Sequence, residues 1–166
     1  MIRPLATILF GLVLGSGAAA AGTCDAIMNG QLKGLTVPTR VVNTDEMNGM
    51  TMSFENIVAD GTIYTHTKDG SWKAEKQSAN EASIRKAWTD KDTCEPAGTE
   101  AVDGEMADVV AEHINVANMP MDSKFWISRK SGQILKSLSA MPTATLTVRY
   151  YYDNIQVPSA GTLPAH

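Results

Sequence analysis

The sequence predicts a single α+β domain in which two helices accompany an antiparallel sheet of eight or nine strands. Apolar residues recur at helical spacing from residue 24 to residue 35. After Pro38, five turn dipeptides separate short segments rich in Val, Ile, Thr, Tyr and Trp, which is typical of β-hairpins. A helix-capping pattern interrupts the strands near residue 78. The chain of 166 residues is long enough to bury one core and too short to predict two domains.

The first 21 residues have the features of a secretory signal peptide. Arg3 provides a positive charge, Leu5 to Leu14 form an apolar run, and Ala18 to Ala21 offer small residues for cleavage. The run is about half as long as a membrane-spanning helix and no later apolar segment is longer, so we expect no membrane span. The sequence thus predicts an exported, periplasmic protein with one domain over residues 22–158 and a flexible C-terminal tail over residues 159–166.

The predicted first helix places four apolar side chains on one face: Cys24, Met28, Leu32 and Leu35. Cys24 and Cys94 are the only two cysteines of the chain. An oxidising compartment favours a disulfide between them, which would close a loop of about 70 residues and stabilise the fold by roughly 4 kcal/mol. Lipidation of Cys24, close behind the signal peptide, is the alternative, but it would leave Cys94 without a partner.

The sheet is predicted from the turns and from the segments between them. The turn dipeptides, which tolerate the positive φ of tight hairpins, are Asn48-Gly49, Asp60-Gly61, Asp69-Gly70, Asp103-Gly104 and Ser131-Gly132. Eight segments have the composition of strands: 39–44, 50–58, 62–67, 72–75, 105–115, 124–129, 134–140 and 145–153. The last of them alternates, so we expect one apolar, aromatic face made of Leu146, Val148, Tyr150 and Tyr152.

The second helix is predicted over residues 78–91. Ser78 and Glu81 have the spacing of a capping box, in which each side chain accepts a hydrogen bond from the other residue's backbone N–H. One face of this helix is apolar and consists of Ile84, Ala87 and Trp88. The proposed disulfide would then join the end of the second helix to the first.

Composition and motifs argue against several functions. The formal net charge is −4, from 14 Lys and Arg and 18 Asp and Glu, so no basic face is available for nucleic acid. The chain after residue 21 has no G-x-S-x-G hydrolase motif and no H-x-x-H, C-x-x-C or EF-hand pattern for a metal. His66 and His113 lie on predicted strands, where partly exposed structural histidines are favoured over a general base. We expect a non-catalytic protein without a cofactor.

Methionine is over-represented, with nine in the chain. Two clusters stand out in the sequence: Met47, Met50 and Met52, and Met119 and Met121. Thioethers bind Cu(I), so these five residues are candidate copper ligands. The favoured interpretation is an apolar face, because Met50, Met52 and Phe54 share one side of a strand and flexible methionines suit a core or an adaptable lipid pocket.

Four stretches of the chain, taken together, carry a family resemblance: 69–73 (DGSWK), 94–104 (CEPAGTEAVDG), 125–132 (FWISRKSG) and 149–158 (RYYYDNIQVP). They resemble small exported bacterial proteins of uncharacterised function that are similar to the periplasmic lipoprotein-carrier (LolA-like) superfamily. The resemblance covers roughly residues 24–158. It implies a strongly curved antiparallel sheet, an unclosed half-barrel, with helices on its concave face.

The resemblance implies a periplasmic, non-catalytic binding protein for a hydrophobic or lipid-like ligand, with an envelope protein as a second candidate partner. Candidate ligand-binding residues are the apolar residues predicted on interior faces: Met50, Met52, Phe54, Ile84, Trp88 and Tyr150. Carriers of this superfamily close a helical lid with a strand-borne arginine, and Arg40 lies on the first predicted strand here. The alternatives are copper binding by the methionines and a structural or interaction module without a small ligand.

Overall fold

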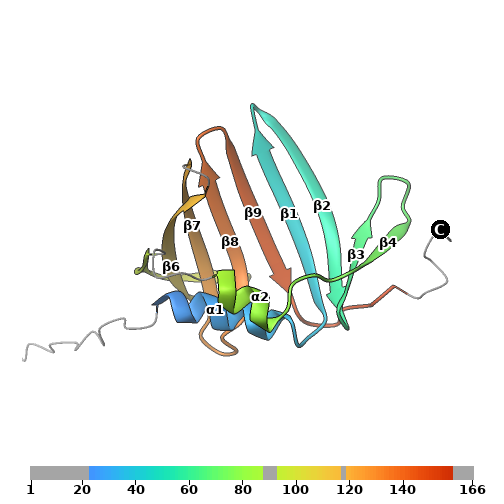
Figure 1. The fold of residues 1–166 in the computed structure, drawn as a ribbon, viewed down its shortest axis with the longest axis horizontal. Coiled ribbons are helices and arrows are strands. Elements are labelled where there is room, and N and C mark those ends of the chain that lie inside the picture. Colours follow the sequence, from blue (N-terminus) through green and yellow to red (C-terminus); the bar gives the residue numbers. More distant parts are fainter. Residues whose placement is uncertain (1–22, 88–92, 117–118, 159–166) are drawn as a thin grey trace, which may run out of the picture.

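The computed structural model describes residues 23–87, 93–116 and 119–158. The predicted signal peptide, the end of the second predicted helix and the predicted tail lie outside these residues. Two helices and nine strands follow along the chain (Figure 1): α1 (Thr23–Gly34), β1 (Thr39–Met47), β2 (Met50–Ala59), β3 (Thr62–His66), β4 (Trp72–Lys76), α2 (Glu81–Ala87), β5 (Thr93–Val102), β6 (Glu105–Val116), β7 (Met119–Ser128), β8 (Ile134–Met141) and β9 (Ala144–Tyr151).

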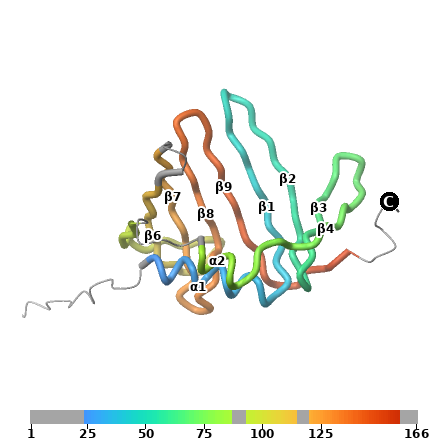
Figure 2. The backbone as a smooth tube through the Cα atoms, viewed as in Figure 1, coloured from blue at the N-terminus to red at the C-terminus, as the bar shows by residue number. Residues whose placement is uncertain are grey.

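All nine strands form one antiparallel sheet in the order β4-β3-β2-β1-β9-β8-β7-β6-β5. The sheet combines two meanders, β1 to β4 and β5 to β9, which join because the first strand pairs with the last. The sheet is curved and not closed, and α1 and α2 lie across one end of its concave side (Figures 1 and 2). The unclosed half-barrel is therefore confirmed. The turn dipeptides predicted hairpins between strands that are neighbours in the sequence, and the pairing of β1 with β9 is an additional, long-range contact.

Three of the five predicted turns have the positive φ at both residues that a two-residue hairpin of the I′ type requires: Asn48-Gly49, Asp60-Gly61 and Asp103-Gly104. In the other two dipeptides only the glycine, Gly70 or Gly132, has a positive φ. Three of the tight hairpins could therefore be predicted from their turn residues alone.

One strand, β5, was not among the eight predicted segments. Its sequence contains Pro96 and Gly98, residues that are depleted in strand interiors. The register with β6 shifts between these two residues, and β5 is an edge strand, so a proline at an irregularity there removes no central ladder hydrogen bond. This strand is the ninth of the sheet.

Two apolar cores lie on opposite faces of the β5–β8 half of the sheet. On the concave face, Ile27 of α1 packs with Val110, Ile127 and Ile134. On the convex face, Trp126 packs with Val102, Ala107 and Val109. The two sets lie on opposite faces because Val109 and Val110 are consecutive residues of one strand, and successive side chains of a strand point in opposite directions. In this half of the sheet, both faces therefore carry a buried apolar core.

Helix α1 packs on the sheet through a different stripe from the predicted one. Ile27 is fully buried, whereas Met28, Leu32 and Leu35 are only half-buried. The reason is Gly30, one turn further along the helix: a Cβ there would lie 2.7 Å from Cγ1 of Ile134. The absence of a side chain lets this stripe approach the sheet most closely.

The disulfide between Cys24 and Cys94 is confirmed, with a Cα–Cα distance of 5.3 Å. It joins the first turn of α1 to the edge strand β5. At the other end of α1, Lys33 Nζ donates a hydrogen bond of 2.5 Å to the carbonyl oxygen of Ser131. The helix is therefore attached to the β5 edge at one end and to the β7–β8 turn at the other.

Helix α2 begins later than predicted, and its cap consists of other residues. Asn80 Oδ1 accepts a hydrogen bond from the Ser83 N–H, and Ser83 Oγ accepts one from the Asn80 N–H. These bonds satisfy two of the backbone donors at the start of the helix, so the capping box is formed by Asn80 and Ser83 and not by Ser78 and Glu81. No helix in the described residues is long and apolar enough to cross a membrane.

Candidate ligand-binding site

The concave face has an open part that α1 does not cover. Five large apolar side chains on β1, β2 and β8 gather there with exposed fractions between 39% and 61%: Met47, Met50, Met52, Phe54 and Met141. We call these five residues the methionine patch. An exposed apolar group of this kind is typical of a binding surface and is unfavourable in a protein without a partner.

Strand register explains how the methionine patch is assembled. Met47 lies opposite Met50 on β2 and opposite Ala144 on β9, and Ala144 in turn lies opposite Met141 on β8. The patch therefore crosses four neighbouring strands. Met141 lies far from both methionine clusters in the sequence, and the pairing of β9 with β1 and with β8 brings it to the others.

An apolar cleft of about 160 Å³ continues the concave face beneath α1. Its walls include Gly30 and Leu35 from the helix side and Val41, Ile134 and Tyr150 from the sheet. Val41 and Met47 point to the same face of β1 because they are six residues apart, which corresponds to about 20 Å along a strand. Between them on this face β1 carries Asn43 and Asp45, whereas β9 carries Val148 and Leu146 opposite these two residues. The apolar path from the cleft to the methionine patch therefore follows β9.

The cleft is apolar although it contains two tyrosines. Burial raises the pKa of Tyr150 and of Tyr152, so both hydroxyls remain neutral at ordinary pH. The Tyr152 hydroxyl donates a hydrogen bond of 2.7 Å to the carbonyl oxygen of Ile134. The alternation predicted for the last strand is confirmed, because Tyr150 packs with the concave core and Val148 is buried. These walls suit a neutral, apolar group.

The structure brings together some of the predicted ligand-binding residues. Met50, Met52 and Phe54 belong to the methionine patch, and Tyr150 lines the cleft. Ile84 is half-buried on α2, which lies beside α1 (Figure 1). Trp88 lies outside the described residues.

The sheet order separates the two methionine clusters of the sequence. Met47 is on β1 and Met121 is on β7, and β9 and β8 lie between these strands. Three strand spacings correspond to about 14 Å along the sheet, too far for two sulfur atoms to share one ion. Among the described residues, no group of three or more His, Cys, Asp or Glu side chains could hold a metal ion either.

Arg40 does not face the helices, in contrast to the lid arginine that the resemblance implied. Val41 lies on the concave face and lines the cleft, so its neighbour Arg40 points to the convex face. There its Nε donates a hydrogen bond of 2.7 Å to Glu55 Oε1, and its Nη2 donates one of 3.0 Å to Oε2. The arginine is therefore part of the outer surface of the half-barrel.

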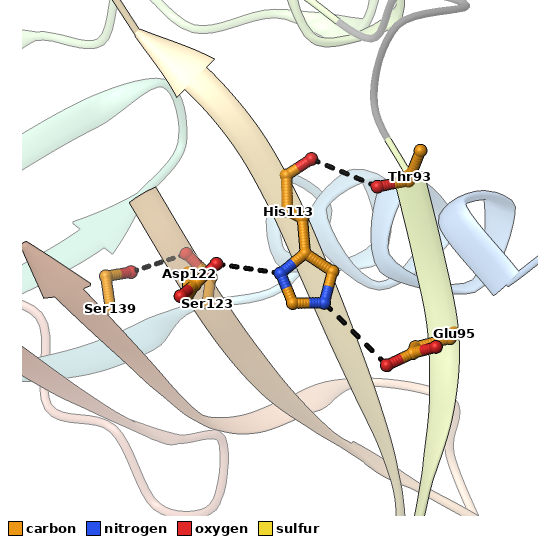
Figure 3. Close-up of polar contacts among 6 residues, drawn as sticks. All are labelled: Thr93, Glu95, His113, Asp122, Ser123 and Ser139. Carbon is orange, nitrogen blue, oxygen red and sulfur yellow. Dashed lines mark hydrogen bonds and ion pairs between the residues drawn. The ribbon is translucent and has the colours of Figure 1, made fainter. Parts of the chain in front are cut away.

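His113 bridges three strands on the convex face (Figure 3). Its Nδ1 lies 2.7 Å from Asp122 Oδ1 on β7, and its Nε2 lies 3.7 Å from Glu95 Oε1 on β5. His66 is exposed on β3. Both histidines are thus exposed residues on strands, as predicted.

The carboxylates beside His113 predict a pH-dependent interaction. The hydrogen bond to Asp122 is the main cause that raises the pKa of His113 above its usual 6.5. Since the folded pKa is raised, the interaction stabilises the fold fully below about pH 6.5 and is lost as the pH rises through the folded value. Titration by NMR is expected to show His113 above 6.5, and Asp122→Asn is expected to lower its pKa more than Glu95→Gln. An unchanged pKa in Asp122→Asn would contradict the assignment.

Comparison with known proteins places the fold. No protein-family model matches the sequence, and no curated protein matches it. Among solved structures, the chain is similar to the lipoprotein LppX of Mycobacterium tuberculosis (TM-score 0.52, 13% identity, 82% of this chain and 94% of that chain). It is also similar to LprF of Mycobacterium bovis (TM-score 0.50, 12% identity, 82% and 97%).

A third similar structure is MucB in complex with MucA(peri), with a TM-score of 0.50 and 14% identity. The match covers 87% of this chain and 58% of that chain. At these identities the likeness concerns the fold alone. The chain therefore has the same kind of fold as LppX and LprF, and its curved, unclosed sheet is the half-barrel that the sequence resemblance implied.

Proposed function

We propose that this protein is a non-catalytic binding protein for a hydrophobic or lipid-like ligand, which lies on the concave face between α1 and the methionine patch. The observation that supports this most is the exposure of five large apolar side chains on the same face of the sheet as an apolar cleft. A ligand that covered them would remove their apolar surface from water, which stabilises the complex in proportion to the area buried.

The shape of this surface favours an extended apolar chain over a compact ligand. The cleft alone, at about 160 Å³, is smaller than the cavities of about 300–1,000 Å³ that hold drug-sized ligands. An alkyl chain can enter the cleft with one end and reach the methionine patch over Val148 and Leu146 of β9, which share the face of Tyr150. Methionines adapt to chains of different shape because their side chains are flexible and polarisable.

Other predictions from the sequence remain proposals. We propose a periplasmic location, which the predicted signal peptide and the fold shared with lipoprotein LppX support. An envelope protein partner is a second proposal, and the complex of MucB with MucA(peri) is a precedent for this fold. A single copper site made from both methionine clusters of the sequence is disfavoured by the separation of Met47 from Met121.

The test is binding of a neutral fluorescent probe, N-phenyl-1-naphthylamine, and its displacement by dodecanol. Replacing Met50, Met52 and Phe54 together by serine is expected to weaken binding about tenfold or more, since each loses about half of the roughly 1.5–3 kcal/mol of a fully buried side chain. The fold is expected to be nearly unaffected, because exposed side chains contribute little to stability.

Met106→Ser is the matched control, because Met106 is similarly exposed, at 48%, but lies at the start of β6. Unchanged probe affinity in the triple variant would refute the proposed site. Stoichiometric Cu(I) uptake that Met50→Leu with Met52→Leu abolishes would support copper binding instead. Native mass spectrometry of protein from its own periplasm would identify a co-purified ligand.

A further inference from the structure

The convex face of β1 to β4 carries a row of polar and aromatic side chains that the proposed function does not use. Arg40 forms the two hydrogen bonds to Glu55 already described, and its guanidinium carbon lies 5.2 Å from the centre of the Tyr151 ring. On the other side of Glu55, the His66 and Trp72 rings lie 4.8 Å apart. Asn56 of β2 lies opposite Thr65 of β3, so Glu55 and His66, the adjacent residues of these strands, lie side by side on this face.

The register shows that these residues come from five strands, β1 to β4 and β9. Arg40 lies opposite Tyr151 on β9, Val42 lies opposite Glu55 on β2, and His66 lies opposite Trp72 on β4. The row therefore faces away from the methionine patch, whose residues alternate with it along β1 and β2. A ligand here would not compete directly with one on the concave face.

A pocket of about 520 Å³ lies over this row. Its walls are Arg40, Glu55, Trp72 and Tyr151 on the sheet side and the segment from Asp153 to Pro158 on the other. Figure 1 shows this segment running from the end of β9 past the ends of β1 and β2 towards β4. The volume lies within the range of about 300–1,000 Å³ that is typical of small-molecule sites.

The Arg40 and Glu55 charges in this pocket balance each other, and Asp153 on the facing segment adds a carboxylate. Glu55 binds the Arg40 guanidinium bidentately, so Arg40 does not need an anionic ligand to balance its charge. The hydrogen bonds between them lower the pKa of Glu55 and raise the pKa of Arg40, so both side chains remain charged. Only two of the five N–H donors of the guanidinium are used in these bonds, and each carboxylate oxygen keeps a further lone pair. The pocket therefore offers hydrogen-bond donors and acceptors together, without a net charge from this pair.

Aromatic rings at both ends complete the arrangement. A pyranose ring has one face of C–H groups, which packs on an aromatic ring, and an edge of hydroxyls, which both donate and accept hydrogen bonds. Trp72 and Tyr151 supply the aromatic surfaces, and Arg40 with Glu55 supplies the polar edge between them. We propose that this pocket is a second ligand site that binds a neutral oligosaccharide, independent of the hydrophobic site on the concave face.

The experiment is isothermal titration calorimetry of the chain without its predicted signal peptide against three neutral tetrasaccharides: cellotetraose, chitotetraose and maltotetraose. We expect one-to-one binding of at least one of them. Trp72→Ala is expected to weaken it about tenfold or more, since a central aromatic anchor typically dominates a site. Glu55→Gln, which keeps the shape of the side chain, is expected to weaken it as well, so the proposal stays testable if Trp72→Ala folds poorly.

Phe54→Ala is the matched control, because it removes an exposed aromatic ring from the opposite face. It is expected to leave saccharide affinity unchanged and to weaken N-phenyl-1-naphthylamine binding, while Trp72→Ala does the reverse. These variants therefore test the hydrophobic site on the concave face and the saccharide site on the convex face independently of each other. Three results would overturn the proposal. The first is that none of the three tetrasaccharides gives heat at millimolar concentration, and the second is that Trp72→Ala binds them as tightly as the unmodified chain does. The third is that a proline-rich peptide binds and no saccharide does.

Discussion

Replacing Trp126 by alanine is expected to lower the free energy of unfolding by about 3–5 kcal/mol, which is a large part of the roughly 5–15 kcal/mol of a typical domain. Trp126 is 4% exposed on the convex face of the sheet, opposite the face on which α1 and α2 lie. Its ring packs on Val102 and Val109, and Lys136 Nζ lies 4.2 Å above the ring centre. Its Nε1 donates a hydrogen bond of 2.8 Å to Glu100.

The measurement is equilibrium unfolding in urea followed by far-UV circular dichroism. Trp126→Phe is the control, since it keeps most of the apolar contact and loses the hydrogen bond to Glu100, with an expected loss of about 1–3 kcal/mol. Glu100→Gln keeps a side-chain acceptor and is expected to cost less than Trp126→Phe. A loss below about 1 kcal/mol in Trp126→Ala would show that the convex cluster is not a second core.

The fold was largely predictable because local chemistry determines the turns. Three dipeptides favour a tight hairpin through the positive φ of their own residues: Asn48-Gly49, Asp60-Gly61 and Asp103-Gly104. Strand β5 was missed because Pro96 and Gly98 contradict strand propensity, and only the bulge at the sheet edge accommodates them. The pairing of β1 with β9 was missed because no local signal specifies which distant strands become neighbours.

The candidate site was predictable only where one strand carries it. Met50, Met52 and Phe54 follow from alternation along β2. Met141 comes close to them only because β9 pairs with both β1 and β8. The row of side chains from Arg40 to Trp72 likewise depends on how several strands pair. Neither arrangement can be derived from the spacing of residues in the sequence. The face through which α1 packs on the sheet could not be predicted from the sequence either. Gly30 weakens a helix in isolation, but here its missing side chain lets α1 approach the sheet most closely.

Loss of the Cys24–Cys94 disulfide is the second large effect that we expect. The bond joins residues 70 apart in the sequence, so its removal frees a long loop in the unfolded chain and lowers the free energy of unfolding by about 4 kcal/mol in the chain-entropy model. The double variant Cys24→Ser with Cys94→Ser removes the bond without leaving a free thiol. Urea unfolding is expected to show the loss together with a larger m value, because an unfolded chain without the cross-link exposes more surface.

The unmodified protein measured in a reducing agent is the control, and it is expected to lose the same free energy as the double variant. Mass spectrometry of the oxidised protein, lighter by two hydrogen atoms than the reduced one, confirms that the bond is present at the start. Because α1 is also held by Ile27, Gly30 and Lys33, we expect the helix to stay docked and the concave face to keep most of its affinity for N-phenyl-1-naphthylamine. A complete loss of probe binding in a folded double variant would show instead that the disulfide alone positions α1 over the cleft.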